Sequence, residues 1–144
     1  MSALVDAITR RMAGTMLETV GLRVVELTDE HAVVEMAFKP EVAQLTGLFH
    51  TGALLTLADS AATSACLHFT DPDGTLDAAR FPLAIQLSAN LIRNSGAGTV
   101  TAEARLIHRG RTTMVVETRV RDEQGRLLAV TTTTHLVLSG LART

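Results

Sequence analysis

The chain contains no tyrosine or tryptophan, and only four of its 144 residues are phenylalanine. Proteins that bind single-stranded nucleic acid stack bases on aromatic side chains and combine them with clusters of Lys and Arg. This sequence has few such aromatics and no basic run, and its formal net charge is only −2. We therefore do not expect nucleic acid as a partner.

Cysteine is nearly absent as well. Cys66 stands alone, which excludes a disulfide within the chain and suits a reducing cytoplasm. Asp6 precedes the first arginines, the reverse of a secretory signal, so we expect a cytoplasmic protein. No metal site is expected, because Cys66 has no spaced partner and the five histidines are scattered, at His31, His50, His68, His108 and His135.

Long uncharged apolar runs, linkers and repeats are also missing. The most apolar segment is interrupted by Thr56, Asp59, Ser60, Thr63 and Ser64, so it does not predict a membrane span. No Pro/Gly/Ser-rich linker divides the chain, which predicts one domain over residues 1–144. A Gly-x-Ser-x-Gly motif is absent, which disfavours a serine nucleophile of the α/β-hydrolase type.

The patterns that are present predict an α+β fold. Residues 3–13 have the spacing of a short amphipathic helix, and a long helix starts near Thr51 and ends before the turn-rich TDPDGT. Alternating or β-branched runs predict strands at 22–28 and 31–38 and within 82–93, 99–109, 112–122 and 126–138. The short links NSGAG, RGR and DEQGR suggest an antiparallel meander. We expect about six strands curling around the long helix.

Asp59 is the only charged residue between Val42 and Thr70. Helical spacing places it in a polar stripe with Thr56, Thr63 and Cys66. A buried carboxylate without a partner is costly, so Asp59 either bonds to nearby backbone or has a function. Together with Thr63 one turn later, it could bind a water molecule and act as general base, or attack a substrate directly.

Charge is distributed unevenly along the chain. Residues 1–79 contain four Lys/Arg and eleven Asp/Glu, whereas residues 80–144 contain nine Arg and four acids. The arginine-rich half has two possible explanations. Its side chains cover solvated strand faces, or some of them meet an anionic ligand, because arginine pairs well with phosphate.

The segment before Asp59 carries a specific motif. QLTGLFHTG places Gln44, Gly47 and His50 at three-residue intervals, and Asp59 follows His50 by nine residues. This resembles the Asn/Gln-x-x-Gly-x-x-His-Gly-Gly pattern, followed by a carboxylate, of hotdog-fold acyl-CoA thioesterases. It is most similar to the phenylacetyl-CoA and 4-hydroxybenzoyl-CoA thioesterase groups, and the resemblance covers roughly residues 15–138. It implies a hotdog fold, a curved antiparallel sheet wrapped around one central helix.

The resemblance also implies roles for individual residues. Asp59 matches the catalytic carboxylate, Thr63 a threonine that assists it, and Gln44 a residue that positions substrate or water. The family glycine whose backbone N–H polarises the thioester carbonyl is replaced by Thr51, and Gly52 follows. The N–H group survives this change, because only proline lacks it. His50 is expected to serve the helix start, with a direct catalytic role as the alternative.

Geometry then indicates a dimer. Thr51 and Asp59 are eight residues apart, about 12 Å along a helix, so they cannot both reach one thioester carbon. If both act on one substrate, they come from different chains, and a twofold pair of antiparallel central helices would supply two such sites. The helix N-terminus favours developing negative charge on the carbonyl oxygen. We expect a homodimer, and a dimer of dimers as the full assembly.

The expected reaction is hydrolysis of an acyl-CoA thioester to free acid and CoA, with no separate cofactor. Arg93, Arg109 and Arg111 lie near strand ends and are candidates to hold the CoA phosphates. Two alternatives stay open. One is a hotdog hydratase or dehydratase that pairs His50 with Asp59 across the dimer, and the other is a non-catalytic acyl-CoA-binding module.

Overall fold

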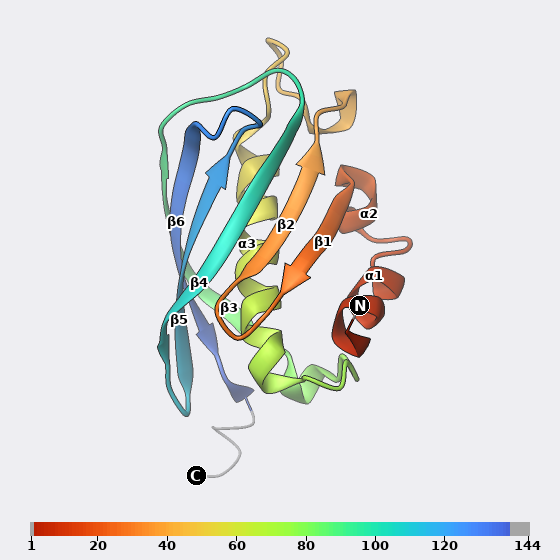
Figure 1. Cartoon of the computed structure of the whole chain (residues 1–144), viewed down its shortest axis with the longest axis vertical. Helices are drawn as coiled ribbons and strands as arrows, with labels where there is room; N and C mark the ends of the chain where they lie inside the picture. Colours follow the sequence, from red (N-terminus) through yellow and green to blue (C-terminus); the bar gives the residue numbers. More distant parts are fainter. Residues whose placement is uncertain (1, 139–144) are drawn as a thin grey trace.

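Six antiparallel strands form one curved sheet around a central helix in the computed structural model, which describes residues 2–138 (Figure 1). The strands are β1 (Leu22–Leu27), β2 (Ala32–Ala37), β3 (Leu83–Leu91), β4 (Thr99–Arg109), β5 (Thr113–Arg121) and β6 (Leu127–Leu136). The helices are α1 (Ala3–Arg11), α2 (Met16–Val20) and α3 (Thr51–Thr70), with 3-10 turns η1 (Pro40–Val42) and η2 (Ala78–Arg80). The predicted α+β hotdog architecture is confirmed.

The core lies between α3 and the inner face of the sheet. Small residues of α3, including Ala58, Ala61 and Ala62, are fully buried and allow the helix to approach the strands closely. Alternate side chains of the strands point inward and pack against α3, and they are fully buried at Val34, Met36, Val100, Val116 and Val120. Complete burial of an aliphatic side chain of this size stabilises a fold by about 1.5–3 kcal/mol. This packing fixes α3 and therefore Asp59 relative to the sheet.

The C-terminal end of α3 is closed by Asp71, within the predicted TDPDGT stop. Its buried carboxylate accepts hydrogen bonds from the backbone N–H groups of Thr75 (3.1 Å) and Leu76 (2.6 Å) and from the Thr75 hydroxyl (2.8 Å). Burial alone would raise the pKa of Asp71, but these bonds and Arg80 outweigh it and hold the pKa below its ordinary value. The charged carboxylate thus shapes the loop that ends the helix.

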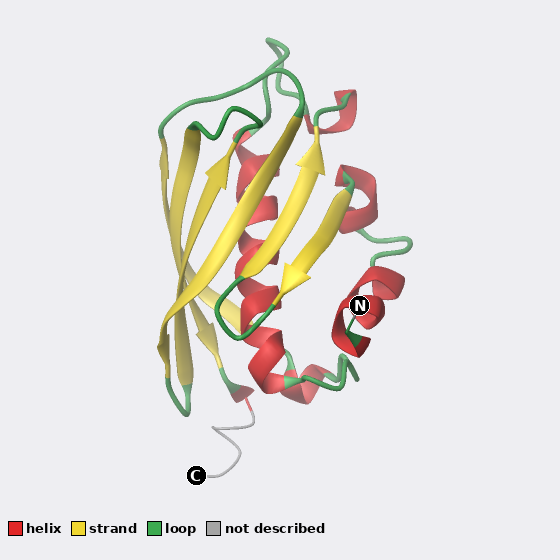
Figure 2. Ribbon diagram, viewed as in Figure 1, coloured by secondary structure: helices red, strands yellow, loops and turns green. Residues whose placement is uncertain are grey.

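The N-terminal helix is shorter than predicted. Instead of one helix over 3–13, α1 ends at Arg11, a turn follows, and α2 begins after the N-cap Thr15. Gly14 in this turn has φ +76°, a left-handed conformation that interrupts a helix and that glycine adopts without strain. Figure 2 shows α1 and α2 beside β1 rather than over the face of α3.

The predicted meander is wrong for one strand. The sheet order is β1-β2-β4-β5-β6-β3, so β3 pairs with β6 at the far edge and not with β4, its successor in the chain. Residues 92–98, which contain NSGAG, are therefore a crossing segment over the end of the sheet and not a hairpin turn (Figure 1). The other two glycine-containing links, between β4 and β5 and between β5 and β6, do join neighbouring strands.

Candidate active site

Residues 42–50 form a tight loop that leads into α3. His50 N–H donates to the Val42 carbonyl at 2.8 Å, and Gly47 adopts φ +84° at the turn. The crossing segment holds this loop from outside, because Asn94 Nδ2 donates to the Phe49 carbonyl at 2.8 Å and Phe49 N–H donates to the Ser95 carbonyl at 2.9 Å. The misassigned segment after β3 thus positions the loop that carries the motif.

Of the first two backbone N–H groups of α3, that of Gly52 is hydrogen-bonded and that of Thr51 is not. His50 is the N-cap, and its Nδ1 accepts a hydrogen bond from Gly52 N–H at 2.8 Å, which confirms its structural role at the helix start. The N–H of Thr51 makes no hydrogen bond within residues 2–138. Of the two expected carbonyl-polarising donors, only Thr51 N–H is therefore available in this arrangement.

Gln44 lies beside His50. Both line a surface pocket of about 450 Å³, together with Ala43, Leu45 and Thr46. The side-chain oxygen of Gln44 accepts hydrogen bonds from the backbone N–H and the hydroxyl of Thr46, which orients the side chain within its own loop. Two predicted site residues, Gln44 and His50, are thus brought together at the N-terminal end of α3.

Asp59 and Thr63 lie further along α3, on its partly exposed face. The partly exposed residues of this face are Leu55, Thr56, Asp59, Ser60 and Thr63. On the opposite face of α3, the side chains are fully buried at Leu57, Ala58, Ala61 and Ala62. Burial raises the pKa of the Asp59 carboxyl, and the nearby His135 partly offsets the rise. The predicted lone carboxylate therefore lies in a site where its charge is poorly solvated, as expected of a functional group.

Thr63 has a hydroxyl that is free to act. The hydroxyls of Thr56 and Ser64 donate to carbonyls four residues earlier, both at 2.8 Å. That of Thr63 makes no hydrogen bond within the described part of the chain, although it lies one turn after Asp59. It is available to a water molecule or a substrate that approaches Asp59.

Cys66 does not belong to this face. It is fully buried in the core, and burial raises the pKa of its thiol to about 12. A thiol of this kind is unreactive at neutral pH. Its inclusion in the predicted polar stripe was wrong, because the sheet covers the C-terminal half of α3 on the side where Cys66 lies.

His135 on β6 was not predicted as a site residue. Its side chain is fully buried on the inward face of the sheet, and it lies close enough to Asp59 for their charges to interact. The available signal was the alternation in TTTTHLV, which places Thr131, Thr133 and His135 on one face of a strand. The structure confirms that all three face inward and are buried.

The three candidate arginines do not form one cluster. Arg109 and Arg111 lie at the β4–β5 turn, whereas Arg93 follows β3 at the opposite end of the sheet, where its N–H bonds to Leu128. The guanidinium of Arg109 stacks over the Phe69 ring at 4.3 Å. No single CoA can be held by all three arginines of one chain.

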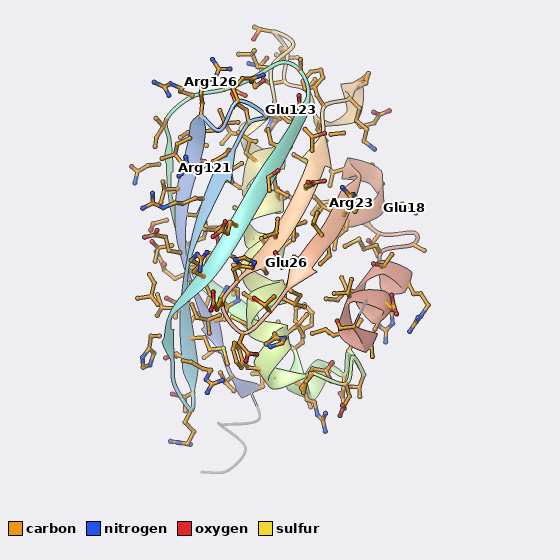
Figure 3. The ribbon with its side chains drawn as sticks, in the orientation of Figure 1. Glu18, Arg23, Glu26, Arg121, Glu123 and Arg126 are labelled. Carbon is orange, nitrogen blue, oxygen red and sulfur yellow. The ribbon has the colours of Figure 1, made fainter. Side chains whose placement is uncertain are left out.

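Other arginines of the second half pair with acids on the same strands or turn. Arg105 contacts Glu103 at 2.6 Å, Arg119 contacts Glu117 at 3.0 Å, and Arg126 contacts Asp122 at 2.7 Å. Figure 3 shows Arg121, Glu123 and Arg126 around the β5–β6 turn, at the end of the sheet. Part of the positive charge of this half is therefore balanced by acids within the same chain.

Residues 2–138 contain no group of three His, Cys, Asp or Glu side chains placed to hold a metal ion. Within the same residues, no helix has both the length and the apolar character needed to cross a bilayer.

Comparison with known proteins places this arrangement in a family. Residues 46–129 match the family model described as the thioesterase superfamily. The chain is 34% identical to ComA2 of Bacillus subtilis over 127 residues, which cover 88% of this chain and 97% of that protein. It is 32% identical over 120 residues to the 1,4-dihydroxy-2-naphthoyl-CoA hydrolase of Listeria monocytogenes, covering 83% of this chain and 93% of the relative.

The fold comparison agrees with the family match. A mutant of the thioesterase PA1618 from Pseudomonas aeruginosa superimposes with a TM-score of 0.82 and 26% identity, over 92% of this chain and 93% of that one. The chain therefore belongs to the thioesterase superfamily, with the hotdog fold, and is a thioester hydrolase.

Proposed function

We propose that the protein hydrolyses acyl-CoA thioesters at a site built from two copies of the chain. The observation that carries this proposal is the separation of the two chemical groups on α3. Thr51 N–H is free at the helix start, and Asp59 lies eight residues further on, about 12 Å along the axis. One carbonyl carbon cannot contact both within one chain, whereas an antiparallel partner helix would bring them together.

Thr51 N–H is proposed to bind the thioester carbonyl oxygen. A free N–H at a helix start faces an anion favourably, because the helix dipole adds to its partial positive charge. The negative charge that develops on the carbonyl oxygen during attack is stabilised there more than the neutral substrate is. Since Gly52 N–H is committed to His50, this donor role belongs to Thr51.

Asp59 of the other chain is proposed to start the reaction. It either takes a proton from the attacking water or attacks the carbonyl carbon and forms a mixed anhydride that water then cleaves. The free hydroxyl of Thr63 is one turn away and assists by binding the water. Gln44, at the mouth of the loop pocket, is proposed to orient the thioester, for which its side-chain NH₂ serves as donor.

The surface of β3 supports the proposed dimer. This edge strand exposes large apolar side chains, which are Leu83, Ile85, Leu87 and Leu91. An exposed apolar edge is a template for pairing with another chain, and β3 is in contact with α3. Pairing of β3 with a second β3 would extend the sheet and cover both surfaces.

The arginine proposal changes with the dimer. Arg109 and Arg111 of one chain are proposed to meet the CoA phosphates, and Arg93, at the other end of the sheet, would contribute only from the partner. A dimer of dimers and a cytoplasmic location remain predictions.

The hydratase alternative gives His50 a chemical role with Asp59. Nδ1 of His50 already accepts a hydrogen bond from Gly52 N–H, so capping the helix is sufficient to explain a histidine at this position. Incubation with a crotonyl-type CoA thioester separates the reactions, because hydration bleaches the enoyl absorbance without releasing thiol. The proposal expects thiol release, and hydration alone would overturn it.

The experiment that tests the function is thiol release from short, medium, long and aryl CoA esters. Aryl esters should be tested first, because the Listeria relative is named for a naphthoyl-CoA substrate. Wild-type turnover that is abolished in Asp59→Asn, with acyl-CoA still bound, supports catalysis. Binding without turnover in both forms would indicate an acyl-CoA-binding module.

A further inference from the structure

Asp59 on α3 and His135 on the inward face of β6 are a titratable pair in a largely apolar layer. The inward side chains of β1, β2, β4 and β5 against α3 are apolar except for Thr118 and Arg109, and Arg109 stacks over Phe69 near the end of α3. The side chains of β3 on the same face, opposite β6, are Ala84, Leu87, Ala89 and Leu91. Further along α3, the thiol of Cys66 stays neutral, and Asp71 at the end of the helix pairs with Arg80 (3.7 Å). Burial has the largest effect on the pKa of Asp59, and His135 is the charged group that counteracts it.

The hydrogen bonds of His135 suit a ring that changes its charge. Nδ1 lies 3.3 Å from the Pro82 carbonyl, which can only accept, so Nδ1 carries a hydrogen in both charge states. Nε2 lies 2.9 Å from the Thr133 hydroxyl, which can either donate or accept. The neutral ring accepts from Thr133, and the protonated ring donates to it. Both contacts therefore survive uptake of a proton in a fully buried position.

We propose that His135, held by Thr133 and Pro82, is a positioning residue that takes up a proton to balance the charge of Asp59 during catalysis. This inference rests on the proposed function, in which ionised Asp59 attacks or activates water. When an apolar acyl group fills the site and excludes water, the charged carboxylate loses solvation, and a positive imidazolium behind it offsets that loss. The ring takes this proton from solvent as the substrate binds and returns it to solvent after hydrolysis, which leaves the ring neutral again.

The electrostatics act in the direction this role needs. Burial raises the pKa of Asp59 and lowers that of His135, so the layer disfavours either charge alone. The opposite charges counteract both effects, because His135 lowers the pKa of Asp59 while the Pro82 bond and Asp59 raise that of His135. The two charges support each other.

The test is the pH profile of kcat, which reports the substrate-bound enzyme, in variants that keep the hydrogen bonds. Asn at position 135 can still donate to Pro82, and Gln can still reach Thr133, but neither takes up a proton. His135→Asn and His135→Gln are expected to move the acidic limb by about half to one pH unit toward higher pH, with the plateau largely kept. Thr133→Val, which removes the switching hydroxyl, moves it in the same direction by less.

Thr131→Val is the matched control. Thr131 is buried on the same face of β6, and its hydroxyl has no partner within the described residues, so its replacement leaves the profile in place. A purely structural role of His135 would lower activity equally at every pH, without moving the limb. That outcome would overturn the inference.

A second measurement does not depend on turnover. The imidazole of His135, assigned in NMR spectra by comparison with His135→Asn, is titrated in wild type and in Asp59→Asn. Its pKa is expected to fall in Asp59→Asn, and an unchanged pKa would contradict the pairing. If no thioester is hydrolysed but the imidazole responds, the proposed function fails and the charge pair stands.

Discussion

Thr51 and Asp59 lie on the same helix more than two turns apart, the first with an unbonded N–H and the second with a poorly solvated carboxylate. In the proposed function, each is half of a hydrolytic site. The free donor directly follows His50, which lines a surface pocket with Gln44, and the carboxylate is on the partly exposed face of α3. For both groups to act on one thioester, as proposed, a second chain must supply one of them.

Replacement of Asp59 should separate activity from stability. Since burial raises its pKa, the ionised carboxylate destabilises the fold, and this penalty grows as pH rises from the ordinary pKa of aspartate through the raised one. Asp59→Asn removes the penalty, so its thermal midpoint should exceed that of wild type at neutral pH and match it at low pH. Calorimetry at both pH values checks this, and a less stable Asp59→Asn at neutral pH would contradict it.

Replacement of Thr51 by proline removes the backbone N–H at this position and leaves the other donors of the helix start in place. Proline is favoured at the first position of a helix, and His50 already has the extended conformation that precedes proline. Thr51→Pro should therefore fold normally and lose about 100-fold or more in kcat, as expected for loss of one carbonyl-stabilising donor. Thr51→Gly, which restores the residue that the family has here, keeps the N–H and should retain kcat within about tenfold.

Gly96 is far from the loop before α3 in the sequence but packs directly against it. A Cβ added there would lie 2.8 Å from the Gly47 carbonyl oxygen and 3.3 Å from a methyl of Leu48. Gly96→Ala must displace the loop, and we expect a loss of about 1–3 kcal/mol in unfolding free energy with a clear fall in kcat/KM. Ala97→Ser, in an exposed position of the same segment, should change neither. Equal behaviour of the two variants would refute a positioning role.

The edge strand β3 is expected to form the dimer interface. Ile85 on β3 is 56% exposed, and Ile107 on β4 is 61% exposed. A charge at Ile85 would be buried in the proposed interface, so Ile85→Asp should yield monomers without thioesterase activity. Ile107→Asp is the matched control and should stay dimeric and active. Light scattering after size exclusion, with activity on the same fractions, decides between them.

Most of the fold could be predicted from periodicity, because strand alternation and the apolar helix are local properties of the sequence. The position of β3 could not, since an edge strand and an inner strand can carry the same alternation. Its pairing with β6 depends on a crossing segment whose anchors, Asn94 and Ser95, contact a loop about 45 residues earlier in the chain. Short glycine-rich links alone do not distinguish a hairpin from a crossover.

The site was predictable to a similar extent. Asp59 stood out as the only charge of its segment, and Thr63 followed from helical spacing. Cys66 shares that spacing but is buried, because the wrap of the sheet around α3 is not encoded in the helix itself. His135 required the register of β6 against α3, which brings together residues 76 positions apart.

The most direct test of the composite site is complementation between two inactive chains. Thr51→Pro and Asp59→Asn are each expected to be inactive alone. When the two are unfolded, mixed in equal amounts and refolded, half of the dimers should contain one of each, with one of their two sites intact. The account predicts recovery of about a quarter of wild-type thiol release. No recovery in a mixture shown to contain mixed dimers would place both groups in one chain and contradict it.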